Sequence, residues 1–482
     1  MGRALFTWLL TENAAWLRAG GVRTALIFWT ACAAPSCGGL SESSREQSRA
    51  AGASTGRPLT SAAVLDGGAA DAGADAASAD PGSDAGARSC IPAGDAGLPT
   101  AGDVNIDLAV EFQTISGFGG INVPGWIDDL TPEQVDTAFG NGPGQIGMSL
   151  LRVRIPYDPA EFALEVPTAV HAVALGARVI ASPWTPPPEL KTVADIVGGE
   201  LRVDAYDAYA EHLLSFRDYM ASNGVALHAI SVQNEPDIRV TYESCSWTAA
   251  QMIDWLTTQG SKFEGTPLIA AESFNFNRAM TDPILNDPAA AAPVGIIGGH
   301  IYGRGLADYP LARSLGKEVW MTEHYTDSSN PANAWPLALN VGKELHDSMS
   351  ANFNAYIWWY IRRSYGPLTE DGLVSKRGYL MAQYAKFVRP GYVRVAASQP
   401  AQGGVFVTAY EHAGDPLVLV AVNQNTSEQN INLAVHNGCA DSFDRFTTSA
   451  SKNLSEDGPV SLVQNRGSVT LDAQSVTTFV SR

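Results

Sequence analysis

Hydrophobic runs of strand length alternate with amphipathic stretches of helix length from Val104 to Arg389. Eight runs are expected to be strands: Ile115–Gly120, Ser149–Ile155, Val179–Ala181, Ala229–Gln233, Leu268–Ala271, Ile296–Ile301, Glu318–Thr322 and Ala355–Tyr360. Helical segments are expected at Pro132–Phe139, Pro167–Leu175, Asp204–Asn223, Thr248–Gln259 and Ala334–Met349. This alternation predicts an α/β fold, a (β/α)8 TIM barrel over residues 118–389. The alternative, an open doubly wound sheet, usually begins with a glycine-rich phosphate loop, and Phe118-Gly119-Gly120 lacks its spacing.

The pattern changes after Gly391. Short runs rich in Val, Thr and Tyr recur there with turn residues between them: Val405–Tyr410, Leu417–Asn423, Ile431–Val435, Ser468–Leu471 and Val476–Val480. They predict an antiparallel side β-sandwich over residues 390–482, attached to the barrel. Residues 103–117 precede the barrel, and their strand, Val104–Gln113, is expected to join this sandwich.

The first 102 residues do not have a globular pattern. Residues 1–37 resemble an export signal, because three early arginines precede the short hydrophobic run Thr24–Ala34, which is too short to span a bilayer. Cys32 and Cys37 leave lipidation open as an alternative to a cleaved signal. Residues 38–102 are dominated by Ala, Gly, Ser and Asp and predict a disordered linker. The expected location is therefore extracellular, either secreted or as a cell-surface lipoprotein.

Composition narrows the possible partners. The 482 residues include 31 Lys and Arg against 50 Asp and Glu, a net charge of −19, which disfavours nucleic acid and anionic lipid as partners. Hydrophobic residues make up 45% of the chain, enough for a large core. Five cysteines do not form a disulfide scaffold, and the pairing of Cys90, Cys245 and Cys439 stays open. We expect a monomer without a membrane span, apart from a lipid anchor if one is attached.

Two glutamates follow predicted barrel strands, where TIM-barrel enzymes place their chemistry. Glu235 lies in Asn234-Glu235-Pro236 after the fourth strand, and Glu323 lies at the end of the seventh. Two carboxyl groups on either side of a sugar are what glycosidic cleavage requires. Asn-Glu-Pro on one strand with a second Glu three strands on resembles the large retaining glycosidase clan built on (β/α)8 barrels. This resemblance implies that Glu235 is the acid/base, that Glu323 is the nucleophile, and that Asn234 binds the sugar 2-hydroxyl. The alternative is that both glutamates are ordinary acidic residues capping loops.

The chain resembles glycoside hydrolase family 30, and within it the bacterial glucuronoxylanase subfamily. The resemblance runs from about Val104 to Arg482 and rests on the blocks FGGINVPGWIDDLT, TAFGN, ASPWTPP, ISVQNEPD, DPILNDP, WMTEHY and YIWWYIRRSYGPL. It implies a retaining mechanism, a barrel with a side β-sandwich, and no metal or other cofactor. It also implies that the polysaccharide partner is glucuronoxylan, cleaved within the chain at positions set by its (4-O-methyl)glucuronic acid branches.

The resemblance also implies a binding site for the uronate. Arg363 follows the eighth strand, and its planar guanidinium can pair with both oxygens of a carboxylate. The matching helpers are Tyr365, Trp359, Tyr325 and Ser328. The alternative for Arg363 is a structural ion pair, a role that we expect for Arg362.

Further residues near the strand ends are candidates for substrate contacts. Trp184 and Tyr302 could stack on sugar rings, although core packing is the alternative for any aromatic residue. Arg152 is expected to pair with a catalytic carboxylate and keep Glu323 ionised, and His300 to contact sugar or orient a carboxylate. No three His or Cys residues have metal-ligand spacing, so we expect no zinc site.

Two rival functions remain at this point. One is a family relative that acts on another β-glycoside, such as a β-1,6-glucan, a β-glucoside, or unbranched or arabinosylated xylan. The other is a catalytically inactive carbohydrate-binding protein. The loop at residues 236–247 departs from the Trp-rich loop of many family members, so the affinity of neighbouring sugar subsites could differ.

Overall fold

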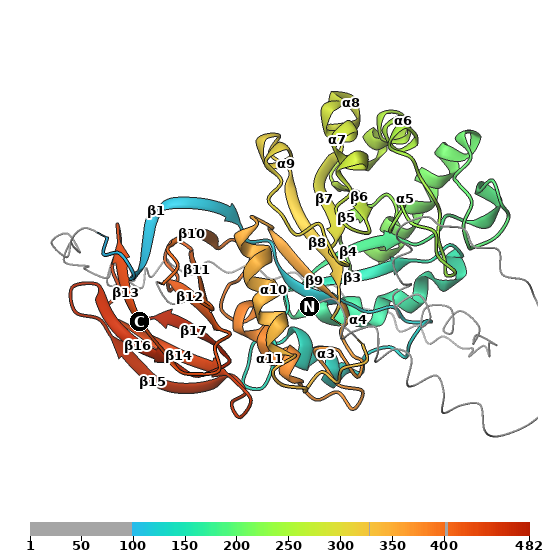
Figure 1. The fold of residues 1–482 in the computed structure, drawn as a ribbon. Helices are drawn as coiled ribbons and strands as arrows, with labels where there is room; N and C mark the ends of the chain where they lie inside the picture. The colour runs from blue at the N-terminus through green and yellow to red at the C-terminus, as the bar shows by residue number, and fades with distance from the viewer. Residues whose placement is uncertain (1–98, 327, 401–402) are drawn as a thin grey trace, which may run out of the picture. The chain divides into compact units, whose positions relative to one another are not determined.

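The computed structural model describes residues 99–326, 328–400 and 403–482. The predicted export signal and nearly all of the predicted linker lie outside the described residues. The first described strand, β1 (Val104–Thr114), is followed by a closed barrel whose eight strands are all parallel: β2 (Gly117–Ile121), β3 (Leu150–Ile155), β4 (Arg178–Pro183), β5 (Leu227–Ser231), β6 (Leu268–Ser273), β7 (Val294–His300), β8 (Glu318–His324) and β9 (Ala355–Tyr360). The predicted fold class is confirmed (Figure 1).

Helices connect the barrel strands, as a parallel sheet requires. They are α3 (Pro132–Phe139), α4 (Val166–Ala174), α5 (Tyr206–Ser222), α6 (Ala249–Gln259), α7 (Arg278–Asn286), α8 (Pro288–Ala291), α9 (Pro310–Ser314), α10 (Leu339–Ser350) and α11 (Lys376–Ala385). Short 3-10 helices are η2 (Pro159–Glu165), η3 (Pro188–Leu190), η4 (Val203–Ala205) and η5 (Gly260–Phe263). The hydrophobic pattern did not predict α7, α8, α9 or α11, and α10 begins five residues later than predicted, at Leu339.

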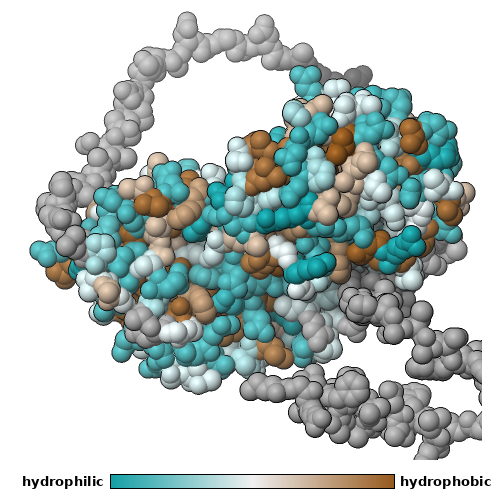
Figure 2. Space-filling view, turned by 45° about the horizontal axis from the view of Figure 1, so that its top comes forward, coloured by the Kyte–Doolittle hydropathy of each residue, from teal (hydrophilic) through white to brown (hydrophobic). Residues whose placement is uncertain are grey.

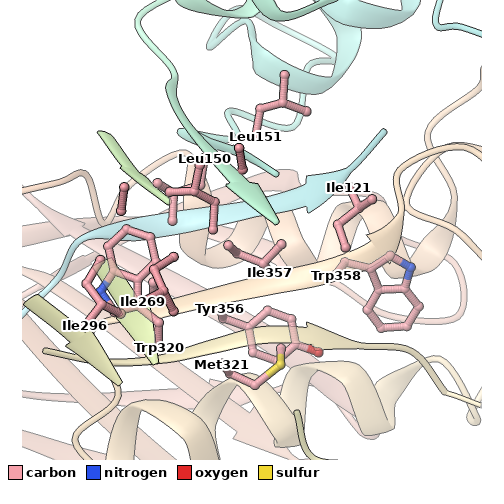
Figure 3. Packing of buried hydrophobic residues seen from close by; sticks show 14 of the residues in the cluster. Ile121, Leu150, Leu151, Ile269, Ile296, Trp320, Met321, Tyr356, Ile357 and Trp358 are labelled. Carbon is pink, nitrogen blue, oxygen red and sulfur yellow. The ribbon is translucent and has the colours of Figure 1, made fainter. Parts of the chain in front are cut away.

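The barrel core is filled by large side chains from neighbouring strands. Figure 3 shows Leu150 of β3, Ile269 of β6, Trp320 of β8 and Ile357 of β9 among the packed residues, and all four are fully buried. The glycine-rich start of the barrel has a packing explanation. A Cβ atom at Gly119 of β2 would collide with the backbone carbonyl oxygen of Leu150 on the adjacent strand, so only glycine fits there.

The C-terminal strands form a second, nine-stranded sheet. Its members after the barrel are β10 (Val393–Ala397), β11 (Val405–Glu411), β12 (Val418–Asn423), β13 (Gln429–His436), β14 (Ser442–Thr448), β15 (Ser455–Ser461), β16 (Arg466–Leu471) and β17 (Ser475–Ser481). The sequence pattern missed β10, β14 and β15. The N-terminal strand β1 lies within this sheet, antiparallel to β10 and parallel to β13, and Figure 1 shows it in blue beside them.

The sheet has a hydrophobic core of its own. Residues from distant strands of the sheet order share this core, including Leu433 of β13 and Phe443 of β14, so the sheet folds over on itself as a sandwich. Its other face contacts the barrel helices. Thr478 of β17 donates a hydrogen bond to the backbone carbonyl of Gln383 in α11 (2.7 Å), and the rings of Phe387 and Phe446 lie 4.8 Å apart.

On the visible face of the molecule, hydrophobic side chains are dispersed among hydrophilic ones (Figure 2). Among the described residues, no helix has the length and hydrophobicity that crossing a membrane would need.

The two described cysteines differ. Cys439 is disulfide-bonded, whereas Cys245 is a buried free thiol. Burial raises the pKa of Cys245 to about 12, so it is an unreactive thiol at neutral pH.

Candidate active site

Polar side chains from seven barrel strands meet at the carboxyl end of the barrel. Each lies on a strand or within a few residues of its end: Arg152 on β3, Trp184 after β4, Asn234 and Glu235 after β5, Glu272 on β6, His300 on β7, Glu323 on β8 and Trp359 on β9. All of these side chains are at least 95% buried. The barrel therefore brings together residues that are more than 200 positions apart in the sequence, at the end where this fold carries its active sites.

The two candidate catalytic glutamates face each other at short range. One carboxylate oxygen of Glu235 and one of Glu323 lie within 4.8 Å of each other. Retaining glycosidases separate their two carboxyl groups by about 5–5.5 Å, whereas inverting enzymes need about 6.5–9.5 Å to hold a water molecule. The observed separation matches the retaining arrangement.

Glu235 is held in a strained backbone conformation. Its φ of 45° lies in the left-handed region, which residues other than glycine rarely adopt. The amide of Glu235 donates to the carbonyl of Glu272 (3.0 Å), and the preceding amide of Asn234 donates to the carbonyl of Pro183 (2.9 Å). Hydrogen bonds to both neighbouring strands thus fix the segment after β5. They hold Glu235 in the strained conformation that directs its side chain into the site.

Two side chains contact the carboxyl group of Glu235. The Tyr242 hydroxyl donates to Oε2 (2.5 Å), and His300 Nδ1 lies 2.9 Å from Oε1. Burial raises the pKa of Glu235 to about 7, with smaller increases from Asp237 and Glu272, and Tyr242 acts against this rise. Burial is therefore the main cause of the raised pKa of Glu235.

Glu323 is paired with a buried arginine. Arg152 Nη1 donates to Oε2 of Glu323 (2.7 Å), and Tyr302 donates its hydroxyl proton to Oε1 (2.9 Å). Burial raises the pKa of Glu323, while the positive charge of Arg152 acts in the opposite direction by favouring the carboxylate. The Tyr302 hydroxyl therefore contacts the candidate nucleophile, a role that its sequence context did not suggest.

Arg152 organises several groups at once. Its Nη2 donates to Oδ1 of Asn234 (2.7 Å) and lies 3.0 Å from Oε1 of Glu272, and its Nε donates to Ser182 (3.0 Å). Because the Asn234 oxygen is used by Arg152, the amide NH2 group of Asn234 is the part left to donate to a ligand. The Arg152 guanidinium also lies over the Trp184 ring, 4.7 Å from its centroid, so one face of that ring is covered by the arginine.

His300 lies between the carboxyl groups of the two glutamates. Its Nε2 lies 3.9 Å from Oε2 of Glu323, and burial lowers the pKa of His300, which favours the neutral ring. Glu235, His300 and Glu323 offer one ligand atom each within 4.8 Å of one another, a grouping that could hold a metal ion. Spacing along the sequence could not reveal this grouping. The adjacent Arg152 guanidinium, however, repels a cation at the same point, and the expectation that no metal takes part stays a prediction.

Tyr302, Tyr325 and Tyr365, which follow β7, β8 and β9, form an aromatic wall that begins at Glu323. The Tyr302 ring lies 5.6 Å from that of Tyr325, and the Tyr325 ring lies 5.0 Å from that of Tyr365, measured between centroids. Trp359 is buried 6.0 Å from Trp184. Within the described part of the chain, the indole nitrogens of Trp184 and Trp359 have no hydrogen-bond partner, so both remain potential donors to a ligand.

The two arginines after β9 have different surroundings. Arg362 donates to the carbonyl of Asp128 (2.8 Å) and to Gln134 (3.2 Å), contacts that tie loops together. Arg363 has a partly exposed side chain, 5.5 Å from the Tyr360 ring centroid, and lies 3.5 Å from Glu370 Oε1. Ser328 is half-buried in the loop after β8, beside position 327, which lies outside the described residues.

Tyr242 is the residue that sequence reasoning missed. It lies in the loop after Glu235, seven positions downstream, and the side chains around it show why it returns to the site. Arg154 of β3 forms a two-pronged pair with the adjacent Glu243, Nη2 to Oε1 at 2.6 Å and Nε to Oε2 at 3.0 Å. This buried pair anchors the loop and directs the Tyr242 hydroxyl toward Glu235. The signal available in the sequence was a Tyr-Glu pair in a loop with a strand Arg elsewhere, which is too weak to use alone.

Comparison with known proteins adds independent information. A family model described as the glycosyl hydrolase family 30 TIM-barrel domain matches residues 157–318. The chain is 43% identical over 394 residues to "Glucuronoxylanase XynC" of Bacillus subtilis, covering 80% of this chain and 92% of that protein.

Solved structures agree with this match. The family 30 subfamily 8 xylanase Xyn30A from Clostridium acetobutylicum superposes with a TM-score of 0.74 at 38% identity, covering 79% of this chain and 100% of the other. A family 30 endoxylanase from Clostridium papyrosolvens C71 gives a TM-score of 0.72 at 35% identity, with the same coverage of 79% and 100%.

Proposed function

The chain belongs to glycosyl hydrolase family 30, and on that basis we propose that it is a retaining endo-β-1,4-xylanase that hydrolyses glucuronoxylan. The observation that carries the proposal is the pair of buried glutamates, Glu235 and Glu323, with oxygens within 4.8 Å of each other. The identity of 43% to a glucuronoxylanase supports the substrate class. Among the rivals, the comparisons do not favour another β-glycoside, and the paired glutamates argue against an inactive binding protein.

In the first half of the proposed reaction, the Glu323 carboxylate attacks the anomeric carbon. Glu235 transfers its proton to the glycosidic oxygen as the bond from that oxygen to the anomeric carbon breaks, and the leaving chain departs with a new hydroxyl group. A pKa of about 7 suits this role, because Glu235 then holds its proton at neutral and mildly acidic pH. The Asn234 amide donates to the 2-hydroxyl of the bound sugar.

In the second half, the ionised Glu235 removes a proton from water. The water oxygen attacks the anomeric carbon, and the bond to Glu323 breaks, which restores both carboxyl groups to their starting states. Arg152 and Tyr302 hold the Glu323 oxygens before attack and receive the carboxylate again on its release. This sequence of steps uses no metal ion and no organic cofactor.

The uronate branch is proposed to bind where β9 ends. The Arg363 guanidinium pairs there with the uronate carboxylate, and the helper residues around the branch are Tyr365, Trp359, Tyr325 and Ser328. Arg363 is partly exposed and precedes Tyr365 of the aromatic wall by two residues, which supports a ligand-binding position over a purely structural one.

The test of the proposal is the product pattern on two polymers. Glucuronoxylan and enzymatically deglucuronidated xylan are digested in parallel, and the products are identified by mass spectrometry. We expect cleavage of the branched polymer only, with one methylglucuronic acid on every product. Equal cleavage of both polymers would contradict branch-directed specificity while leaving the glycosidase assignment intact.

We further propose that the protein is exported and acts outside the cell as a monomer. The predicted export signal and the predicted linker rich in Ala, Gly, Ser and Asp support export. N-terminal sequencing and intact mass of protein isolated from its source cells would distinguish a cleaved signal from lipidation at Cys32 or Cys37. Light scattering would give the oligomeric state.

A further inference from the structure

Two loops that follow barrel strands at their carboxyl ends enclose a cleft. One loop connects β4 to α5 and the other connects β5 to α6, directly after Glu235. The cleft has a volume of about 400 Å³ and is lined by Thr192, Gly198, Gly199, Glu200, Ile238, Arg239, Val240, Ser244 and Ser246. Its size falls within the range of about 300–1,000 Å³ that small ligands occupy.

The walls of this cleft are preformed. The amide of Ser244 donates to the carbonyl of Ile196 (2.9 Å), and the amide of Ser246 donates to the carbonyl of Gly199 (2.8 Å). The Ser244 hydroxyl in turn accepts from the amide of Gly198 (2.9 Å). Beneath them the buried ammonium group of Lys191 donates to three oxygens, on Thr185 (2.8 Å), Asp195 (2.7 Å) and Ser244 (2.8 Å). The two loops therefore form one rigid unit, so little ordering is needed when a ligand binds.

The lining chemistry suits a sugar chain. Hydroxyl groups, glycine backbone and two charged side chains outnumber the apolar residues, and among the described residues no aromatic side chain lines the cleft. Arg239 is exposed, and in the described part of the chain it forms no ion pair. Glu200 stands on the other loop, where its Oε2 accepts from Gln251 (2.9 Å). An arginine and a carboxylate together offer donors and acceptors to sugar hydroxyls, whereas the carboxylate disfavours an anionic ligand.

The position of the cleft points to one end of the substrate. Arg239 follows Glu235 by four residues, so their Cα atoms lie within roughly 14 Å of each other, a distance that a few sugar residues cover. Glu235 is the proposed proton donor to the leaving group, and the loop begins at Glu235 and returns to it through Tyr242. Because the proton of Glu235 goes to the departing chain, a cleft formed by the loop after Glu235 is suited to that chain.

We propose that this cleft binds xylose residues of the departing chain, with Arg239 and Glu200 hydrogen-bonding to sugar hydroxyls from opposite loops. The assignment rests on the proposed xylanase function and adds to it a site on the leaving-group side. It makes Arg239 a determinant of preference for substrates with a long leaving chain. These loops then act on substrate binding and leave the chemistry of Glu235 and Glu323 unchanged.

The test uses two glucuronic-acid-branched substrates that share the same glycosyl part. One has nitrophenol as its leaving group and the other has xylotetraose. Arg239→Ala should lower kcat/KM about tenfold on the xylotetraose substrate, the loss expected for one hydrogen bond to a charged group, and leave the nitrophenyl substrate unchanged. Glu200→Gln should show a smaller loss of the same kind. Arg482→Ala, which removes an exposed arginine from the C-terminal sheet, is the control and should change neither value.

The outcomes separate the two levels of the proposal. If wild-type protein hydrolyses both substrates but Arg239→Ala affects both equally or neither, the cleft assignment is overturned and the xylanase function stands. If wild-type protein hydrolyses neither substrate, the proposed function is overturned, and the cleft assignment with it. A loss confined to the xylotetraose substrate in Arg239→Ala supports both.

Discussion

Removing the hydroxyl group of Tyr242 should shift the pH dependence of activity upward. The Tyr242 hydroxyl donates to Oε2 of Glu235 at 2.5 Å, a bond that favours the ionised carboxyl and lowers its pKa. In Tyr242→Phe that bond is lost while the burial of Glu235 remains. The pKa of Glu235 should therefore rise above its present value of about 7.

The size of the shift follows from the strength of the bond. A hydrogen bond to a charged group contributes about 1.5–3 kcal/mol, and one pKa unit corresponds to about 1.4 kcal/mol. His300 still contacts Glu235 in the variant, so we take the lower end, a rise of about one unit. Glu235 must be protonated to act as the acid, so activity is lost as pH rises through its pKa. The falling limb should move from about pH 7 to roughly pH 8.

The assay is kcat/KM from pH 5 to 9.5 on a branched xylo-oligosaccharide, because this ratio reports groups of the free enzyme. Tyr392→Phe is the matched control, since its hydroxyl donates to the carbonyl of Pro416 near the C-terminal sheet (3.2 Å), and its profile should equal that of wild type. A falling limb that stays in place, or moves to lower pH, in Tyr242→Phe would show that the Tyr242 hydroxyl does not lower the pKa of Glu235. A uniform loss of activity at every pH would indicate a purely structural role.

Three other predictions concern stability, specificity and metal dependence. The pKa of Glu235 is raised from 4.5 to about 7 in the folded state, so its burial lowers stability as pH rises from 4.5 through 7. The free energy of unfolding of Glu235→Gln, taken relative to that of wild type, should therefore increase by about 3 kcal/mol from pH 4.5 to pH 8. Denaturant unfolding at both pH values measures this difference. An equal difference at both would contradict this. Arg363→Ala should lower kcat/KM on branched xylan by an amount equivalent to about 2–4 kcal/mol of transition-state binding, and should change it little on linear xylo-oligosaccharides. Equal losses on both substrates would show that Arg363 does not recognise the branch. Dialysis against EDTA should leave kcat unchanged, and a loss restored by a divalent cation would show that Glu235, His300 and Glu323 bind a required metal.

Much of the fold could be predicted from sequence because the barrel strands are buried on both faces and form continuous hydrophobic runs. The C-terminal sheet was harder. Strand β15 (Ser455–Ser461) contains Gly458 and Pro459 and is mostly exposed at the sheet edge, so it has neither a hydrophobic run nor an alternating pattern. Pairing of β1 with β10 and β13 joins residues that are at least 279 positions apart, and no local pattern records such contacts.

The candidate site was predicted in part for a similar reason. Glu235 and Glu323 follow strand patterns that are readable in sequence, and the barrel then dictates that they meet. The contacts of Tyr242 and the hydroxyl of Tyr302 depend on loop paths and side-chain directions, which strand patterns do not specify. The dominant cause of the raised pKa of Glu235 is burial, a property of the packed barrel as a whole.

In the proposed mechanism, Glu323 forms a covalent bond to the sugar while Glu235 supplies the proton. The most direct measurement is mass spectrometry of peptides after reaction with a branched 2-deoxy-2-fluoro-xylooligosaccharide fluoride, which slows release of the glycosyl group. We expect one sugar adduct, located on Glu323, and no adduct in Glu323→Gln. An adduct on Glu235 or on another residue, or full turnover by Glu323→Gln, would contradict it.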